Sequence, residues 1–216
     1  MARAKKRKKF FDVEIPLVKK ETQLQAYEIG ELDGRFMKYD LTRILRGKSM
    51  LLQCKIKIKN DKAVAIPTNT KLLSYYLRRM VRKGTNYVED SFTTPSQESM
   101  ILIKPFLITR KRVSRVVRKT LRNKCKNWLE DYIAEKKDNE IFNEILSNKL
   151  QKSLSLMLKK TYPLSLCEIR VLEIKRQLKP EEVPKIKPKP KVVKEKQKKE
   201  IEEGLDQLAE IEEEKK

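Results

Sequence analysis

The sequence predicts an α+β protein, with strands gathered in the first third of the chain and long amphipathic helices further on. Short runs of alternating apolar and polar residues fill residues 11–67, which is typical of strands. Later segments repeat apolar residues every three or four positions, as helices do. After Leu178 the composition changes to Lys, Pro and Glu. We therefore predict a basic N-terminal arm (1–10), a globular α+β core (11–178) and a linker with a tail (179–216) that is disordered alone.

The charge is one-sided and confined to the first two parts. The chain has 52 Lys and Arg against 30 Asp and Glu, a net charge of +22. Residues 179–216 hold 11 of each sign, so 41 basic and 19 acidic residues, the whole excess, lie in residues 1–178. Such a surplus favours a polyanionic partner.

Little in the sequence predicts catalysis, and we expect no cofactor, no metal and no small-molecule substrate. Histidine is absent, which removes the usual general base and the commonest metal ligand. Cys54, Cys125 and Cys167 are widely spaced and read as reduced, buried residues. No phosphate-binding glycine loop or nucleophile elbow occurs. No apolar run approaches the ~20 residues of a membrane span, and the basic start is followed by acidic residues, unlike a signal peptide. We expect a cytoplasmic protein without a membrane partner.

The start, "MARAKKRKKF", has six basic residues in its first nine and no acidic one. We expect this arm to become ordered on nucleic acid, although a solubilising tail would look the same. Its candidate RNA-binding residues are Lys5, Lys6, Arg7, Lys8 and Lys9.

Residues 11–67 are expected to be mostly extended. The runs "LQAYEI", "RFMKYDL" and "LLQCKIKI" are separated by turn signals around Gly30, Gly34 and Gly47. In residues 53–59, lysines alternate with isoleucines, so one face of that strand is apolar and the other cationic. The lysines at 55, 57 and 59 either protect a sheet edge or contact RNA.

"TNTKLLSYYLRRMVRKG" is predicted as a helix capped by one of residues 68–70 and ended by Gly84. Leu73, Tyr76, Leu77 and Met80 form its inward stripe. Cations near its end suit the helix dipole as well as RNA. The candidates here are Arg78, Arg79, Arg82 and Lys83.

Two strands, in "NYVEDSFTT" and "SMILIKPFLITR", should precede a strongly basic helix. Residues 110–126 contain nine Lys or Arg and no acidic residue, although like charges three or four positions apart repel. An apolar stripe runs Val113, Val117, Leu121, Cys125, Trp128, Tyr132, with the cations on the opposite side. A solvated helix usually mixes signs, so we predict RNA contact by Arg110, Lys111, Arg112, Arg115, Arg118, Lys119, Arg122 and Lys126.

A further helix is predicted from residue 138 to Pro163, followed by a last strand at "LSLCEIRVLEIKRQL". Its predicted inward residues are Ile141, Ile145, Leu146, Leu150, Leu154 and Met157 or Leu158.

Four segments resemble the archaeal and eukaryotic small-subunit ribosomal proteins of the S3Ae family, also called eS1. They are "LDGRFMKYDLTRIL", "TNTKLLSYYLRRMVRKGTNYVEDSFTT", "ILIKPFLITRKRVSRVVRKTLRNKCKNWLEDYI" and "KKTYPLSLCEIRVLEI". The resemblance implies a mixed, β-barrel-like sheet, no catalysis, and a place on the small-subunit platform near the rRNA 3′ end and the mRNA exit, beside other platform proteins. It assigns rRNA contact to Arg35 and to the basic segment. The short basic start is of the archaeal type, and the tail after Leu178 matches nothing.

The sequence thus predicts a structural, ribosome-associated constituent of the small ribosomal subunit that acts in translation, with small-subunit rRNA, neighbouring platform proteins and mRNA near the exit as partners. A free-standing RNA-binding or RNA-chaperone protein is the alternative. A carboxylate-dependent nuclease is disfavoured, because acidic pairs such as Glu89/Asp90 are only sequence neighbours.

Overall fold

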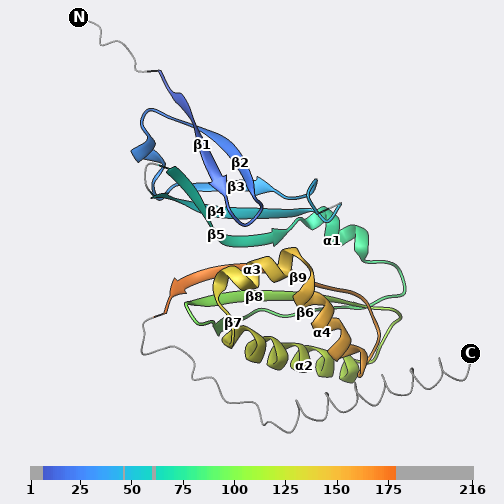
Figure 1. Ribbon diagram of the computed structural model, residues 1–216. Helices are drawn as coiled ribbons and strands as arrows, with labels where there is room; N and C mark the ends of the chain where they lie inside the picture. Colours follow the sequence, from blue (N-terminus) through green and yellow to red (C-terminus); the bar gives the residue numbers. More distant parts are fainter. Residues whose placement is uncertain (1–6, 46, 60–61, 179–216) are drawn as a thin grey trace, which may run out of the picture. The chain divides into compact units, whose positions relative to one another are not determined.

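The computed structural model describes residues 7–45, 47–59 and 62–178 (Figure 1). The strands are β1 Lys9–Ile15, β2 Lys20–Ala26, β3 Phe36–Asp40, β4 Met50–Lys59, β5 Lys62–Leu72, β6 Tyr87–Glu89, β7 Phe92–Pro95, β8 Ser99–Thr109 and β9 Leu164–Gln177. The helices are the 3-10 helix η1 Ile29–Leu32 and the α-helices α1 Ser74–Met80, α2 Arg115–Ala134, α3 Asp138–Leu146 and α4 Lys149–Lys159. The first six residues of the predicted arm and the whole predicted tail lie outside the described residues, while the last two arm residues belong to β1.

The described strands form one mixed sheet in the order β2-β1-β5-β9-β8-β6. In addition, β4 pairs with β5 and carries β3, and β7 pairs with β8. The β1–β5 pairing is parallel and the others are antiparallel. The predicted α+β class is confirmed. The pairings among the described strands leave the sheet open, so the barrel-like closure is not confirmed.

The strand alternation follows the sequence closely in β4. Leu52, Cys54 and Ile56 are buried, whereas Lys55 and Lys57 between them are exposed, because successive side chains of a strand point to opposite faces. Strand β8 is apolar over most of its length, and eight of its 11 residues are buried. It pairs with β9 on one side and with β6 and β7 on the other.

The prediction of a helix from residue 68 is wrong for residues 68–72. Residues 68–72 continue β5, and α1 occupies only Ser74–Met80. Its N-cap residue is Leu73, whose side chain makes no capping hydrogen bond. Strand β5 pairs with both β4 and β9 here, and these ladders outweigh the local helical pattern. Tyr76 and Leu77 face inward as predicted, and Gly84 adopts a left-handed φ in a turn beyond the helix end.

The basic helix exists, but it begins later than its charge run. Ser114 is the N-cap of α2, and its hydroxyl accepts a hydrogen bond from the Val117 amide. The fully buried residues are Leu121, Cys125, Leu129 and Ile133. The predicted inward positions Trp128 and Tyr132 are instead partly buried and stack on each other, with ring centroids 4.6 Å apart.

The single helix predicted over 138–163 is two helices. Asn148 stands between α3 and α4 with a left-handed φ of 59°, a conformation that asparagine tolerates better than most residues. Most of the predicted apolar positions face the core: Ile141, Ile145, Leu150, Leu154 and Leu158 are buried. Leu146 and Met157 are only partly buried. The split lets each helix pack separately.

Helices α2 and α4 pack on each other and against the strands β6, β7 and β9 (Figure 1). A buried ion pair ties β9 to the segment before β4: Lys48 Nζ lies 2.6 Å from Glu168 Oε2 and 2.8 Å from Asn148 Oδ1. A second buried group fixes the β7–β8 turn, where Asp138 accepts hydrogen bonds from Ser96 and Ser99 at 2.5 and 2.6 Å.

Candidate nucleic-acid interface

Four of the predicted cations form one exposed row on α2. Arg115, Lys119, Arg122 and Lys126 are spaced four, three and four residues apart, which places them on a single helix stripe. The sequence predicts this row opposite the apolar side, but it flanks the edge of β6 and β7. The Arg122 Nε donates to the Glu89 carbonyl at 3.2 Å, and Lys126 Nζ lies 5.8 Å from the Phe92 ring centroid.

Arg118 does not belong to this exposed row. It is only partly exposed, and its Nε is buried without a hydrogen-bond partner among the described residues. Lys124 is not part of the row either, and its Nζ donates a hydrogen bond to the Thr161 hydroxyl at 2.9 Å. Arg118 is therefore less exposed than the other predicted cations of this helix.

The position of Arg115 on the helix is unfavourable for the isolated chain. Arg115 is the first residue of α2, and the first turn carries no acidic residue. Cations at a helix N-terminus face the positive end of the helix dipole, where an anion would be favoured. The side chains of Arg115 and Lys119 also make no hydrogen bond or ion pair with any described residue. Helix stability therefore does not account for these two cations.

A second basic group continues the row at the start of α2. The loop that carries Arg110, Lys111 and Arg112 is exposed and precedes the helix. It is held to the turn before β6 through Asn86, whose side-chain oxygen accepts from the Val113 amide at 2.9 Å and whose carbonyl accepts from the Thr109 amide at 2.9 Å. That turn carries two more of the predicted cations, Arg82 and Lys83, both exposed. The fold thus brings together two basic segments that are nearly thirty residues apart in sequence.

The remaining predicted residues lie elsewhere. Lys8 Nζ stands 5.6 Å from the Tyr27 ring centroid, and Arg35 donates to the Gln25 carbonyl at 3.2 Å, so both belong to the β1–β3 region. Arg79 donates to the Gly47 carbonyl at 3.3 Å and lies over the Tyr76 ring, contacts that give it a structural role. Arg7, Lys9 and Arg78 are exposed, and Lys5 and Lys6 lie outside the described residues.

Sequence reasoning missed three cations that the sheet places near the row. Lys71, Lys104 and Arg170 come from β5, β8 and β9 and line one cavity of about 450 Å³ with Glu89 and Asp90. Arg170 forms an ion pair with Glu89 at 3.0 Å. Each of the three stands apart from the basic clusters of the sequence, so only the strand register reveals that they converge.

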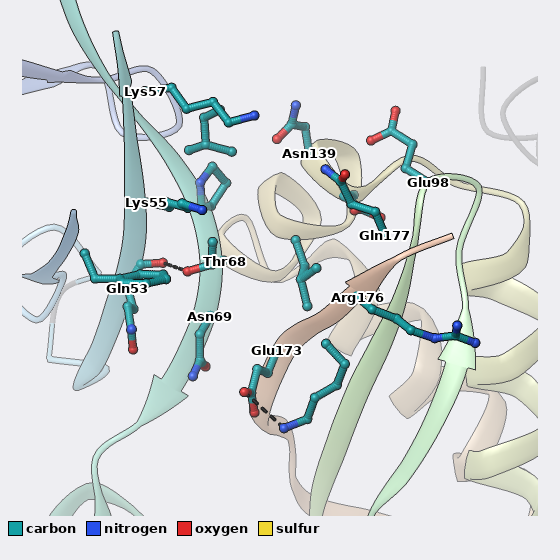
Figure 2. Close-up of a pocket in the computed structure, with 16 residues that line it drawn as sticks. Gln53, Lys55, Lys57, Thr68, Asn69, Glu98, Asn139, Glu173, Arg176 and Gln177 are labelled. Atoms are coloured by element: carbon teal, nitrogen blue, oxygen red, sulfur yellow. Dashed lines mark hydrogen bonds and ion pairs between the residues drawn. The ribbon is translucent and has the colours of Figure 1, made fainter. Parts of the chain in front are cut away.

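The lysine face of β4 borders a different and larger pocket of about 650 Å³ (Figure 2). Lys55 and Lys57 lie on its strand side, and Asn139 and Gln177 lie opposite. The lining also includes three carboxylates, Glu98, Asp138 and Glu173. This mixture of signs suits a polyanion less well than the α2 row does. At Lys55, β4 is paired on both sides, so that lysine does not protect a free edge.

Other chemistry finds little support in the described part of the chain. Residues 7–45, 47–59 and 62–178 contain no group of three or more potential metal ligands. The three cysteines are free, and burial raises the pKa of the Cys54 and Cys125 thiols to about 12, which disfavours the reactive thiolate. Among the described helices none is both long and apolar enough to cross a membrane.

Comparison with known protein families identifies the family of this chain. The model of the family described as "Ribosomal S3Ae family" matches residues 3–177. The chain belongs to the Ribosomal S3Ae family. This agrees with the resemblance in the four segments described above, and membership carries a structural role rather than catalysis.

Archaeal relatives of the family align over most of the chain. It is 22% identical over 166 residues to the small ribosomal subunit protein eS1 of Nanoarchaeum equitans, covering 73% of this chain and 84% of that protein. The eS1 proteins of Methanothermobacter thermautotrophicus and Methanobrevibacter smithii are 27% and 25% identical over 140 and 186 residues. These alignments cover 61% and 78% of this chain and 72% and 96% of the relatives.

Proposed function

We propose that this protein is a structural constituent of the small ribosomal subunit that holds rRNA on the exposed row of α2 and on the basic loop and turn beside it. The proposal includes the place that the family resemblance implies: the platform near the rRNA 3′ end and the mRNA exit, beside other platform proteins. The matched archaeal relatives, which are named small ribosomal subunit protein eS1, support the subunit assignment.

The RNA part of the proposal rests on one observation: cations near the start of α2 have no acidic partner among the described residues. Arg115 and Lys119 are exposed and have no counter-charge among the described residues, and the helix dipole disfavours Arg115 in the first turn. A phosphate backbone would supply that counter-charge and release bound counterions, which gives strong and salt-sensitive affinity. Arginine adds bidentate contacts to phosphate.

The arm and Arg35 form a second, separate contact in this proposal. Lys8 and Arg35 belong to the β1–β3 region, where they lie beside Tyr27 and Gln25 respectively. A basic arm at the N-terminus suits RNA that wraps past the edge of the sheet, since such segments order on their partner.

The test uses charge reversals that leave internal contacts alone. The double variant Arg115→Glu/Lys119→Glu should fail to enter small subunits, whereas Lys152→Glu/Lys159→Glu, the same charge change on exposed lysines of α4, should enter normally. Incorporation is measured by sucrose-gradient sedimentation and immunoblotting. Wild-type stoichiometry of the α2 variant in small subunits would refute this face as the rRNA contact.

The same gradient tests the alternative of a free-standing RNA-binding protein. That alternative predicts that most of the unaltered protein sediments outside ribosomal fractions, even at low salt. Retention with small subunits after a high-salt wash excludes it.

A further inference from the structure

Two adjoining cavities form a trough beside the α2 row. The first, of about 430 Å³, lies between α1 and β6 and is lined mainly by apolar atoms of Leu77, Val81, Tyr87 and Phe106. The second is the cationic cavity of about 450 Å³ described above. Both are lined by Glu89 and Arg170, so the ion pair of these residues marks the boundary between an apolar and a charged end.

An exposed aromatic ring stands at the apolar end. Tyr87 belongs to β6, a strand at the end of the sheet order, and 56% of its surface is exposed. Its ring stacks on Phe106 with centroids 6.1 Å apart and an interplanar angle of 23°. The stack fixes the orientation of the tyrosine, and its exposure leaves aromatic surface available to a planar ligand.

Cations line both cavities of the trough. Arg78 lines the apolar cavity, and Arg170, Lys71 and Lys104 line the charged one, against only Glu89 and Asp90. The Glu89 side chain is already paired with Arg170, and its carbonyl accepts from Arg122 of the α2 row. The trough therefore has a cationic excess and touches the row directly.

We propose that the trough binds an unpaired nucleotide of RNA, with the base stacked on Tyr87 and the adjoining phosphates beside Arg78, Arg170 and Lys104. This rests on the proposed function, because it extends the same RNA-binding surface. A flat apolar ring next to converging cations is the combination by which proteins hold single-stranded RNA. The apolar cavity is also within the roughly 300–1,000 Å³ typical of small-ligand sites.

A peptide is the alternative ligand for the trough, and the excess of cations in the charged cavity disfavours it. An apolar peptide side chain would fill the cavity by Leu77 and Val81, but it would bring no counter-charge to the charged end, where the three cations outnumber the two carboxylates. RNA supplies both a flat base and phosphates from one nucleotide, so it satisfies both ends of the trough.

The test measures binding of the full chain to a short single-stranded RNA that carries one 2-aminopurine, whose fluorescence is quenched by stacking. Tyr87→Ala should weaken binding roughly 5-fold to 100-fold, by the usual worth of base–aromatic stacking, and abolish the quenching. Tyr87→Phe should retain both. Phe36→Ala is the matched control, because Phe36 is a 57% exposed aromatic on β3, away from the trough, and its loss should change neither readout.

An abasic nucleotide separates stacking from charge. Replacing the reporter base by an abasic site should weaken binding to the unaltered protein but not to Tyr87→Ala. Equal losses in both proteins would overturn the base-binding proposal. Loss of the stack on Phe106 should lower the urea midpoint of Tyr87→Ala, so circular dichroism without urea must show the folded spectrum before a loss of binding is ascribed to the missing ring.

The outcomes for the trough and for the α2 row are distinguishable. If Arg115→Glu/Lys119→Glu loses RNA while Tyr87→Ala binds and quenches as the unaltered chain does, the proposed function stands and the trough proposal falls. Ultraviolet cross-linking in purified small subunits should attach a nucleotide to the peptide containing Tyr87. A chemical cross-link from Lys71 or Lys104 to another protein, with no nucleotide on that peptide, would identify the trough as a protein interface instead.

Discussion

Replacing Arg115 by glutamate should stabilise the isolated chain and weaken its binding to RNA, two effects of opposite sign from one side chain. Arg115 is the first residue of α2, follows the N-cap Ser114 and has no described partner. Any cost of the substitution within the folded protein is therefore small.

The gain in stability comes from two local terms. A charge that complements the dipole in the first helical turn contributes about 0.3–1 kcal/mol, and the present arginine has the wrong sign. The i,i+4 pair with Lys119 changes from repulsive to attractive, and each of these interactions contributes about 0.2–0.5 kcal/mol. We expect the free energy of unfolding to rise by about 1 kcal/mol, and by about half of that in Arg115→Gln.

Two measurements check the prediction on the same preparations. Urea denaturation followed by circular dichroism gives the change in unfolding free energy. Titration of rRNA fragments at several salt concentrations gives the slope of log affinity against log salt. That slope should become shallower by about 0.7–0.9 for each phosphate that the variant no longer neutralises.

Either of two results would refute the reasoning. A less stable Arg115→Glu protein would mean that the arginine side chain stabilises the folded chain in its own right. An unchanged salt slope with unchanged affinity would mean that no phosphate lies against Arg115, so that the counter-charge must be sought elsewhere.

Three further predictions concern the interior and the turns. Lys48→Met leaves the buried carboxylate of its ion pair unpaired and should lower the free energy of unfolding by about 3–5 kcal/mol in urea denaturation; no change would show that the pair is solvated. Burial raises the pKa of the Cys54 and Cys125 thiols to about 12, so alkylation of either by iodoacetamide at pH 8 should proceed only as fast as the chain unfolds, and rapid labelling of the native protein would contradict this. Hydrogen bonds from the Thr42 hydroxyl and amide lower the pKa of Asp40, so this carboxylate adds stability above its unfolded-state pKa that is lost as the pH falls through the folded one; Thr42→Val should raise the Asp40 pKa in an NMR titration, and an unchanged value would exclude the hydroxyl as the cause.

The sequence predicts well those parts of the fold in which local pattern and tertiary packing agree. The alternation of lysine and isoleucine in β4 survives because the two faces of that strand differ in burial. The error at residues 68–72 arises from long-range pairing: Asn69, Thr70 and Lys71 lie opposite residues of β9, about a hundred positions later. Such pairing leaves no trace in local propensity.

The candidate site likewise contains residues that local sequence pattern predicts and residues that only long-range strand pairing brings together. The charge run of α2 is visible in the sequence because its members are neighbours on one helix. The convergence of Lys71, Lys104 and Arg170 is not, because it requires the register of three strands. The break at Asn148 is equally hidden, since the apolar period continues across it and only the left-handed backbone reveals the bend.

The narrow junction between β5 and β9 has a consequence for the synthesis of this protein. Among the described strands, β9 alone links β5 to β8, and its ladder with β5 joins only residues 69–71 to residues 171–173. A product of premature termination before codon 164 would therefore hold two unconnected strand groups with bare edges, which favour aggregation. Since Arg170 also lies on β9, the proposed trough needs this strand as well, and a product truncated before it would lack part of that surface.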